Sequence, residues 1–280
     1  MSRWSLSFLS RGRLRVDLRP GSVTLARKQS FFGSRLQPLQ SVAVDQDEAA
    51  EPSALWRAGV DALGGMLSRA RPSGARVEVV ISSHFVRYVL VPWSESLVRD
   101  ADRLAFARLA CREVYGALVD GWEVCLDDPP AGQAAFASAI DRELLAAIQN
   151  AVAHVGANLE AVIPALADCI NRHRRVLRKR DFCLANVEAG RLTFAFRGNA
   201  GWRAVRTRRA DGPLPELLPT LLKQEASASG VPEGGRLYLC ALRVRDHANI
   251  LVPGWKVVLL DEAALPAPPM VEPTLISMES

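Results

Sequence analysis

Two short stretches of this 280-residue chain place an acidic or amide side chain a few residues before a glycine, between apolar runs. They are "DLRPG" at 17–21 and "NVEAG" at 186–190. A glycine turn can bring backbone N–H groups close to a phosphate, and an adjacent carboxylate can hold the water ligands of Mg²⁺. Phosphate binding is therefore the first chemistry to consider at these two turns.

Each turn lies inside a strand–turn–strand pattern. "RLRVDLRPGSVTLAR" (13–27) alternates apolar and polar residues around its Pro-Gly pair, and "FCLANVEAGRLTFAF" (182–196) indicates two buried strands. Residues 17–26 align with 186–195 at an offset of 169 residues. The identical pairs in this alignment are Gly21 with Gly190, Thr24 with Thr193, and Ala26 with Ala195. This repeat predicts two similar α/β lobes, each beginning with a hairpin.

The rest of the chain alternates between helical and strand patterns. A loop rich in Gln, Ser and acids follows the first hairpin, and Pro52 then opens a helix. "VEVVISSHFVRYVLVPW" (77–93) indicates two strands with a turn near Ser82 and Ser83. Val98, Ala101, Ala105 and Leu109 recur at helical spacing and predict an amphipathic helix over 95–118. Pro164 begins another helix, and four prolines make the tail at 264–280 an expected disordered segment.

Composition indicates a globular protein of the cytosol. Hydrophobic residues make up 49% of the chain, the net charge is +5, and only four of the 35 basic residues are Lys. Such Arg-rich basicity is weak evidence for nucleic acid binding. The five cysteines include no C-x-x-C pair and lie in apolar runs, which is typical of reduced thiols. The sequence shows neither a signal peptide nor a membrane span, so we expect a soluble, cytoplasmic chain.

Three stretches resemble the actin-like proteins of bacterial type IV pilus and type II secretion machines. They are the N-terminal hairpin, "VEVVISSHFVRYVLVPWSE", and "LLAAIQNAVAHVGANLEAVIPALADCINRH", which together extend over roughly residues 10–260. The family includes PilM-like proteins, their MSHA-pilus counterpart and the cytoplasmic domain of the type II secretion L protein. The resemblance implies an α/β, actin-like (ribonuclease H-like) two-lobe fold. Its expected parts are a first lobe (1–92 and 163–180), an inserted α+β subdomain (93–162), a reduced second lobe (181–263) and the tail (264–280).

The resemblance implies a degenerate nucleotide site. The active fold has a D-x-G sequence at each turn and a Gly-Gly pair after a late strand. In this chain Arg19 replaces the first Gly, Pro20 has no N–H to donate, Asn186 replaces the second Asp, and Glu188 brings a carboxylate to a phosphate position. "LYLCALRV" has no glycine. The remnants of the site are Asp17, Arg19, Ser22, Asn186, Glu188 and Gly190.

We therefore expect no catalysis and no cofactor, which makes the chain a pseudo-ATPase. An alternative stays open, in which Arg19 contacts phosphate directly and the turn registers differ by one or two residues. The protein would then be a nucleotide-binding ATPase switch that uses Mg-ATP.

The family's role implies a scaffold at the cytoplasmic side of the inner membrane. Such a protein binds the short cytoplasmic N-terminal peptide of a single-span membrane partner and links it to the assembly or secretion ATPase. A groove or a strand edge would hold the extended peptide. The resemblance places this binding at the strand ending "YVLVPW" and the helix after it. The candidate contact residues are Tyr88, Leu90, Trp93 and Leu97.

Other candidate sites are less specific. "NRHRRVLRKR" (171–180) carries Arg172, Arg174, Arg175, Arg178, Lys179 and Arg180. This basic cluster is typical of a solvated helix end, and the alternative is a surface for anionic lipid or nucleic acid. Without interleaved aromatic residues, nucleic acid is the weaker of these two. The histidines (His84, His154, His173 and His247) show no ligand-like spacing with Cys or Asp, so no metal is expected. The P-loop and G-x-S-x-G motifs are absent.

Overall fold

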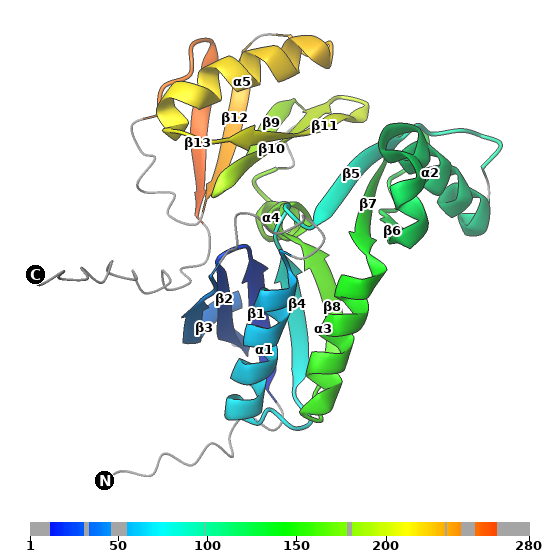
Figure 1. The fold of residues 1–280 in the computed structure, drawn as a ribbon. Coiled ribbons are helices and arrows are strands. Elements are labelled where there is room, and N and C mark those ends of the chain that lie inside the picture. The colour runs from blue at the N-terminus through cyan, green and yellow to red at the C-terminus, as the bar shows by residue number, and fades with distance from the viewer. Residues whose placement is uncertain are drawn as a thin grey trace, which may run out of the picture. The chain divides into compact units, whose positions relative to one another are not determined.

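The structure is a computed structural model that describes residues 12–30, 34–45, 55–97, 99–177, 181–232, 234–241 and 250–261. The described residues divide into two compact units. The first contains the residues up to Val79 together with Asn150–Glu160, and the second contains Val80–Gln149 and the residues from Ala161 onward. The strands form two five-stranded sheets and one three-stranded sheet. Figure 1 shows these sheets and the helices between their strands.

The first sheet has the strand order β3-β2-β1-β4-β8. Its strands are β1 (Arg13–Arg19), β2 (Ser22–Ser30), β3 (Ser34–Ala43), β4 (Arg76–Ile81) and β8 (Asn158–Pro164). Adjacent strands β1, β2 and β3 run antiparallel. The helix α1 (Arg57–Ala70) packs on β1 and β2 through a buried stripe that includes Val60, Leu63 and Leu67.

The second sheet has the strand order β11-β10-β9-β12-β13. Its strands are β9 (Phe182–Glu188), β10 (Gly190–Gly198), β11 (Gly201–Ala210), β12 (Gly235–Ala241) and β13 (Trp255–Asp261). The hairpin strands are antiparallel, and β12 runs parallel to both β9 and β13. The helix α5 (Leu214–Ala228) lies across this sheet (Figure 1) and buries Leu214, Leu218 and Leu222 against it.

The two sheets share one connection pattern, which confirms the predicted pair of lobes. In each, the first strand is central, the second and third strands follow on one side, and the fourth and fifth lie on the other. The hairpin registers also agree at the offset of the sequence repeat: Asp17 faces Thr24 in one hairpin, and Asn186 faces Thr193 in the other. The two strand–turn–strand predictions are therefore correct in both position and register.

The reduced second lobe is visible in what separates its last two strands. Residues 242–254 alone lie between β12 and β13, whereas the corresponding connection from β4 to β8 contains a complete subdomain. That subdomain has a sheet of order β5-β7-β6, formed by β5 (Val86–Val91), β6 (Trp122–Leu126) and β7 (Ala135–Asp141). Its helix is α2 (Asp100–Tyr115), which is followed by the 3-10 turn η2 (Gly116–Gly121). The helix α3 (Arg142–His154) comes after β7 in the chain and, among the described residues, contributes none to the core of this subdomain.

The structure corrects three expectations about these elements. The segment predicted as a polar loop after the first hairpin contains β3, a strand at the edge of its sheet with Pro38 beside a register shift. The two strands of 77–93 do not pair with each other, because β4 joins the first sheet and β5 joins the three-stranded sheet. In α2 the buried residues are Ala107 and Cys111, so the predicted apolar face, with Leu109 at 52% exposure, was wrong.

The predicted domain limits stay a prediction, although two strands fall differently from them. β5 lies inside the range 1–92 but belongs to the three-stranded sheet, and β8 begins inside 93–162 but belongs to the first sheet. Pro52 and the tail at 264–280 lie outside the described residues. In the part of the chain that the structure describes, no helix combines the length and apolar composition that a bilayer span needs.

Candidate functional site

The first turn is a tight two-residue connection. Arg19 pairs with Ser22 across β1 and β2, which leaves Pro20 and Gly21 as the turn, with Gly21 at a φ of 72°. Only glycine adopts this left-handed conformation easily, so the sequence fixes the turn locally. Arg19 and Ser22 are half-buried, and Asp17 lies two residues before the turn with only 2% of its surface exposed.

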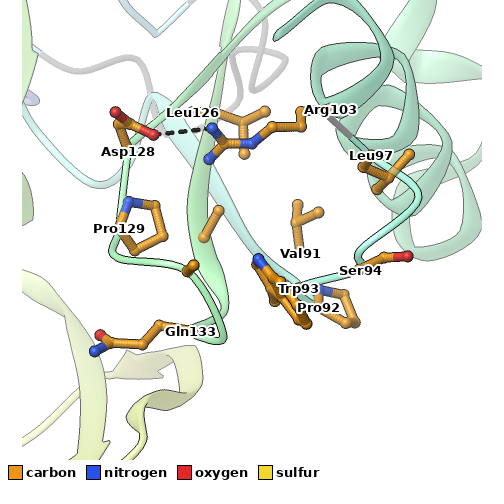
Figure 2. Close-up of a pocket in the computed structure, with 12 residues that line it drawn as sticks. Val91, Pro92, Trp93, Ser94, Leu97, Arg103, Leu126, Asp128, Pro129 and Gln133 are labelled. Carbon is orange, nitrogen blue, oxygen red and sulfur yellow. Dashed lines mark hydrogen bonds and ion pairs between the residues drawn. The ribbon is translucent and has the colours of Figure 1, made fainter. Parts of the chain in front are cut away.

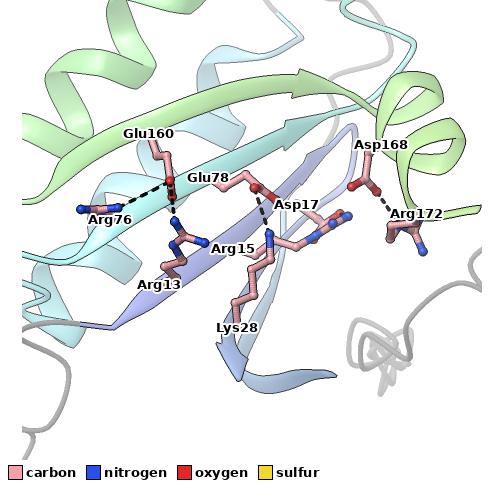
Figure 3. Close-up of polar contacts among 9 residues, drawn as sticks. All are labelled: Arg13, Arg15, Asp17, Lys28, Arg76, Glu78, Glu160, Asp168 and Arg172. Atoms are coloured by element: carbon pink, nitrogen blue, oxygen red, sulfur yellow. Dashed lines mark hydrogen bonds and ion pairs between the residues drawn. The ribbon is translucent and has the colours of Figure 1, made fainter. Parts of the chain in front are cut away.

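Asp17 accepts two hydrogen bonds from a side chain of its own strand, β1. Arg15 Nε donates to Asp17 Oδ2 and Arg15 Nη2 donates to Asp17 Oδ1, each at 2.9 Å. The two residues share a strand face because they are separated by one position (Figure 3). Both carboxylate oxygens therefore accept charge-assisted hydrogen bonds from a buried guanidinium. The negative charge of Asp17 is therefore already compensated inside the protein.

The second turn has the same shape but different partners. Glu188 pairs with Arg191 across β9 and β10, and Ala189 and Gly190 form the turn, with Gly190 at a φ of 68°. The Glu188 carboxylate is buried and its Oε2 atom accepts a hydrogen bond from the backbone N–H of Ser83 at 2.9 Å. Asn186 Nδ2 donates to the same oxygen at 3.3 Å. The carboxylate thus receives N–H groups from the protein itself.

Arg191 completes this contact with the segment between β4 and β5. Its Nη1 atom donates to the carbonyl oxygen of Ser83 at 3.0 Å. Burial lowers the pKa of Arg191, and the nearby Arg87 acts in the same direction while Glu188 opposes it. Both backbone polar groups of Ser83 are therefore bound by the two residues that flank the second turn. Sequence reasoning missed Ser83 and Arg191 in this role, because the contact joins residues distant in the chain.

The third feature of the active fold cannot be placed. The segment after β12, where a Gly-Gly pair would approach adenosine, begins at residue 242 and lies outside the described residues. The absence of glycine there stays a sequence observation.

A cavity of about 240 Å³ lies at one end of the three-stranded sheet. Its walls come from the end of β5 and the segment after it, the end of β6, the start of β7 and α2. Figure 2 shows Trp93 and Leu97 on one side, Pro129 and Gln133 on the other, and the Arg103–Asp128 ion pair across the top, with an Nη1–Oδ1 distance of 2.8 Å. Trp93 is 46% exposed, which is unusual for so large an apolar side chain.

The four predicted partner-binding residues do not form one surface. Trp93 and Leu97 line this cavity, whereas Tyr88 lines a second cavity of about 240 Å³ with Phe136, Pro164 and Trp202. Tyr88 is buried, its ring meets Phe136 edge-on at 5.6 Å, and burial raises its pKa above the ordinary range of a phenol. Leu90 shares the strand face of Tyr88 and lines neither of these cavities.

The basic cluster is divided in the same way. Arg172 is partly buried in α4 (Ala165–His173), where its Nε atom donates to Asp168 Oδ2 at 2.8 Å. Arg174 and Arg175 are exposed just beyond the helix, and Arg178, Lys179 and Arg180 lie outside the described residues. A cationic helix end of this kind is stabilised by the helix dipole.

Several solved structures resemble this chain. A Bacteroides thetaiotaomicron protein with an actin-like ATPase fold and unknown function aligns over 92% of this chain and 94% of its own, at a TM-score of 0.62 and 11% identity. A chain of the PilM–PilN type IV pilus biogenesis complex aligns over 88% of both chains, at a TM-score of 0.61 and 15% identity. The chain has an actin-like ATPase fold. The cytoplasmic domain of EpsL, an inner membrane component of the Vibrio cholerae type II secretion system, aligns over 88% of this chain and 85% of its own, at a TM-score of 0.53 and 15% identity.

The sequence itself matches no protein-family profile and no curated protein. The expected resemblance to pilus and secretion proteins is thus confirmed at the level of structure. In this actin-like chain, the two hairpins that the sequence repeat singled out carry an Arg-bound Asp17 and a buried Glu188.

One sequence statement about this actin-like chain was wrong. His173 does have ligand-like spacing, because it lies one helical turn after Cys169 on α4. The structure also brings Cys240 of β12 to this pair, and the ligand atoms of all three residues lie within 4.8 Å of one another. The i, i+4 spacing was a signal for the first two residues. Nothing local indicated the third.

Proposed function

We propose that this chain is a non-catalytic actin-like platform protein of a type IV pilus or type II secretion machine. It lies at the cytoplasmic face of the inner membrane, binds the cytoplasmic N-terminal segment of a single-span partner, and links that partner to the assembly ATPase. The observation that carries the non-catalytic part is the buried pair of Arg15 and Asp17. The carboxylate that would organise Mg²⁺ is neutralised by a guanidinium inside the same strand.

The second hairpin supports the same conclusion. Glu188 already receives the N–H of Ser83, and its negative charge would repel an incoming phosphate. Breaking the Arg15–Asp17 pair at the first hairpin would leave a buried charge without compensation, which costs several kcal/mol. ATP binding that displaced Asp17 from Arg15 would have to supply that free energy.

The cavity beside Trp93 supports the partner-binding part. Apolar side chains of Val91, Trp93, Leu97 and Leu126 line it, and Arg103 and Asp128 provide charge of both signs at one side. An extended peptide can place one apolar side chain in such a pocket and its polar groups at the rim. The structural likeness to a chain of the PilM–PilN complex supports a peptide from a membrane partner.

The proposal predicts that a neighbouring gene encodes a small single-span protein with a short cytoplasmic N-terminal segment, and the direct test uses that protein. A synthetic peptide of its cytoplasmic N-terminal segment is titrated into the full chain, and binding is followed by fluorescence anisotropy. We expect saturable binding that does not require nucleotide, and co-purification of the two full-length proteins. The proposal is overturned if the peptide does not bind, or if the purified chain hydrolyses Mg-ATP in a manner that Asp17→Asn abolishes.

A further inference from the structure

Two cysteines and a histidine from distant parts of the chain meet inside the second compact unit. Cys169 and His173 belong to α4, and Cys240 is the penultimate residue of β12. α4 packs against β9, and Cys240 pairs in register with Asn186 of β9. The neighbouring strands therefore hold the Cys240 thiol opposite the helix face that carries the other two side chains. The cluster is therefore formed by a helix and a strand together.

The spacing of the cluster matches a transition-metal site. Residues four apart on a helix project from the same face, so one metal ion can bind both Cys169 and His173. In a tetrahedral site, Zn–S bonds of about 2.3 Å and Zn–N bonds of about 2.1 Å place the ligand atoms about 3.6–3.8 Å apart. The three ligand atoms here lie within 4.8 Å of one another, so shifts of about 1 Å or less would complete the geometry.

The chemistry of the ligands selects the ion. Thiolate and imidazole groups are soft ligands that favour Zn²⁺ over Mg²⁺ or Ca²⁺, which take oxygen ligands. Both cysteines have 0% exposure. Two buried thiolates without a cation would be costly, but two thiolates with one Zn²⁺ carry no net charge. The burial of the site is therefore compatible with the bound, deprotonated state.

We propose that Cys169, His173 and Cys240 bind one Zn²⁺ ion, which fixes α4 to the end of β12. Three protein ligands leave one tetrahedral position for water. His173 is partly exposed, whereas both cysteines of the cluster are buried. Water can therefore reach the fourth position from the solvent near His173. The ion adds a link between a helix and a strand that otherwise meet through packing. This proposal is independent of the proposed function, because it concerns neither hairpin turn nor the cavity beside Trp93.

The test measures metal uptake by the full, reduced chain. Zinc content after gel filtration is determined by elemental analysis, and Co²⁺ is then titrated as a spectroscopic substitute. We expect one Zn²⁺ per chain, together with tetrahedral d–d bands and a thiolate-to-cobalt charge-transfer band. Cys169→Ser, Cys240→Ser and His173→Ala each remove one ligand of the ion. Loss of a group that only hydrogen-bonds to a ligand weakens metal binding by about 10- to 100-fold, so loss of a ligand itself should weaken Zn²⁺ binding by more than this.

Two other cysteines provide matched controls. Cys183→Ala replaces a buried thiol of β9, and Cys125→Ser replaces an exposed one; neither thiol belongs to the cluster. Both variants should retain the wild-type Co²⁺ spectrum. If a ligand variant fails to fold, the wild-type spectrum still decides the question.

Three results would overturn the proposal. The first is a reduced wild-type chain that shows no thiolate-to-cobalt band. The second is a Cys169–Cys240 disulfide in the purified chain, with no metal uptake after reduction. The third is an unchanged Co²⁺ spectrum in folded Cys169→Ser or Cys240→Ser protein.

Discussion

Arg15 and Asp17 lie on one face of β1, and both oxygens of the Asp17 carboxylate accept hydrogen bonds from the Arg15 guanidinium at 2.9 Å. Both side chains are almost completely buried. A buried pair of this kind is strongly coupled, because each charge lacks the water that would otherwise solvate it. In the proposed function, this pair is what keeps Asp17 from acting as a ligand-binding carboxylate.

The first prediction concerns the stability that depends on this pair. Arg15→Ala leaves Asp17 as a buried, uncompensated charge and should lower the free energy of unfolding by about 3–5 kcal/mol. Arg13→Ala is the matched control, since Arg13 lies on the same strand and pairs with Glu160 at a side-chain exposure of 49%. The control should change stability by about 1 kcal/mol or less. Urea unfolding measures both, and equal losses would contradict the interpretation.

The second prediction concerns nucleotide. Millimolar Mg-ATP should leave the melting temperature of the full chain unchanged, because a ligand that does not bind the folded state cannot stabilise it. The partner peptide serves as the positive control and should raise the melting temperature in the same assay. A Mg²⁺-dependent rise with ATP that disappears in Asp17→Asn would instead favour the ATPase switch.

The third prediction concerns the contact between the second hairpin and Ser83. Glu188→Ala removes the carboxylate that accepts the Ser83 N–H, so this amide should exchange with solvent faster. An unsatisfied buried donor costs about 1–3 kcal/mol, which corresponds to about a 5- to 150-fold increase in exchange rate. The N–H of Phe85 bonds to the Ser82 carbonyl and should keep its protection. Hydrogen exchange followed by NMR resolves the two amides, and equal protection of Ser83 in both proteins would refute the role of Glu188.

The fourth prediction concerns the cavity at the end of the three-stranded sheet. Leu97→Ala and Trp93→Ala remove apolar lining and should each weaken binding of the partner peptide by about 10-fold or more. Leu118→Ala is the control for Leu97→Ala, because Leu118 is a 70% exposed leucine of the same subdomain outside the cavity. Calorimetric titration gives the affinities. Equal weakening by Leu97→Ala and Leu118→Ala would place the peptide elsewhere.

The fifth prediction concerns alkaline pH. Burial raises the pKa of the Cys183 thiol well above its ordinary value of 9.0 and that of Tyr88 above its ordinary value of 10.0. Above these ordinary values the unfolded chain loses a proton that the folded chain keeps, so the unfolded state binds fewer protons. The free energy of unfolding should therefore decrease by about 1.4 kcal/mol per pH unit for each group.

The variants separate the two contributions. Burial also raises the pKa of Cys111, Cys125 and Tyr115, so each variant removes the contribution of one group only. Cys183→Ala should reduce the slope above pH 9 by about 1.4 kcal/mol per pH unit, and Tyr88→Phe should reduce the slope above pH 10 by the same amount. Denaturant unfolding between pH 7 and pH 11 gives the slopes. Wild-type slopes in both variants would show that neither buried group controls the alkaline limit.

The hairpins were predictable because their signals are local. A Pro-Gly or Ala-Gly pair between alternating apolar residues specifies a two-residue turn, and both φ values of the turn glycines, 72° and 68°, require that residue type. The edge strand β3 was missed because it is mostly polar and contains Pro38, which is tolerated at an edge next to a bulge. Its sequence differs little from that of a loop.

Pairing between distant strands could not be predicted from local pattern. β4 and β5 are adjacent in sequence and separated by a short turn, yet they enter different sheets. The hydrogen-bond partners of the two buried carboxylates differ in the same way. The Arg15–Asp17 pair could have been predicted, because the two residues are two positions apart on one strand. The contact of Ser83 with Glu188 depends on the tertiary fold and could not. Cys240 reaches Cys169 and His173 for the same reason.

The equal register of the two hairpins bears on the ancestry of this chain. Asp17 faces Thr24 as Asn186 faces Thr193, and Arg19 faces Ser22 as Glu188 faces Arg191. A duplicated gene segment would give this correspondence, because turn length and ladder pairing survive substitutions that alter charge. At the equivalent position one hairpin carries the cation Arg19 and the other the anion Glu188. Agreement between the two hairpins thus lies in their backbone pairing, whereas only Gly21, Thr24 and Ala26 have identical counterparts among the aligned residues.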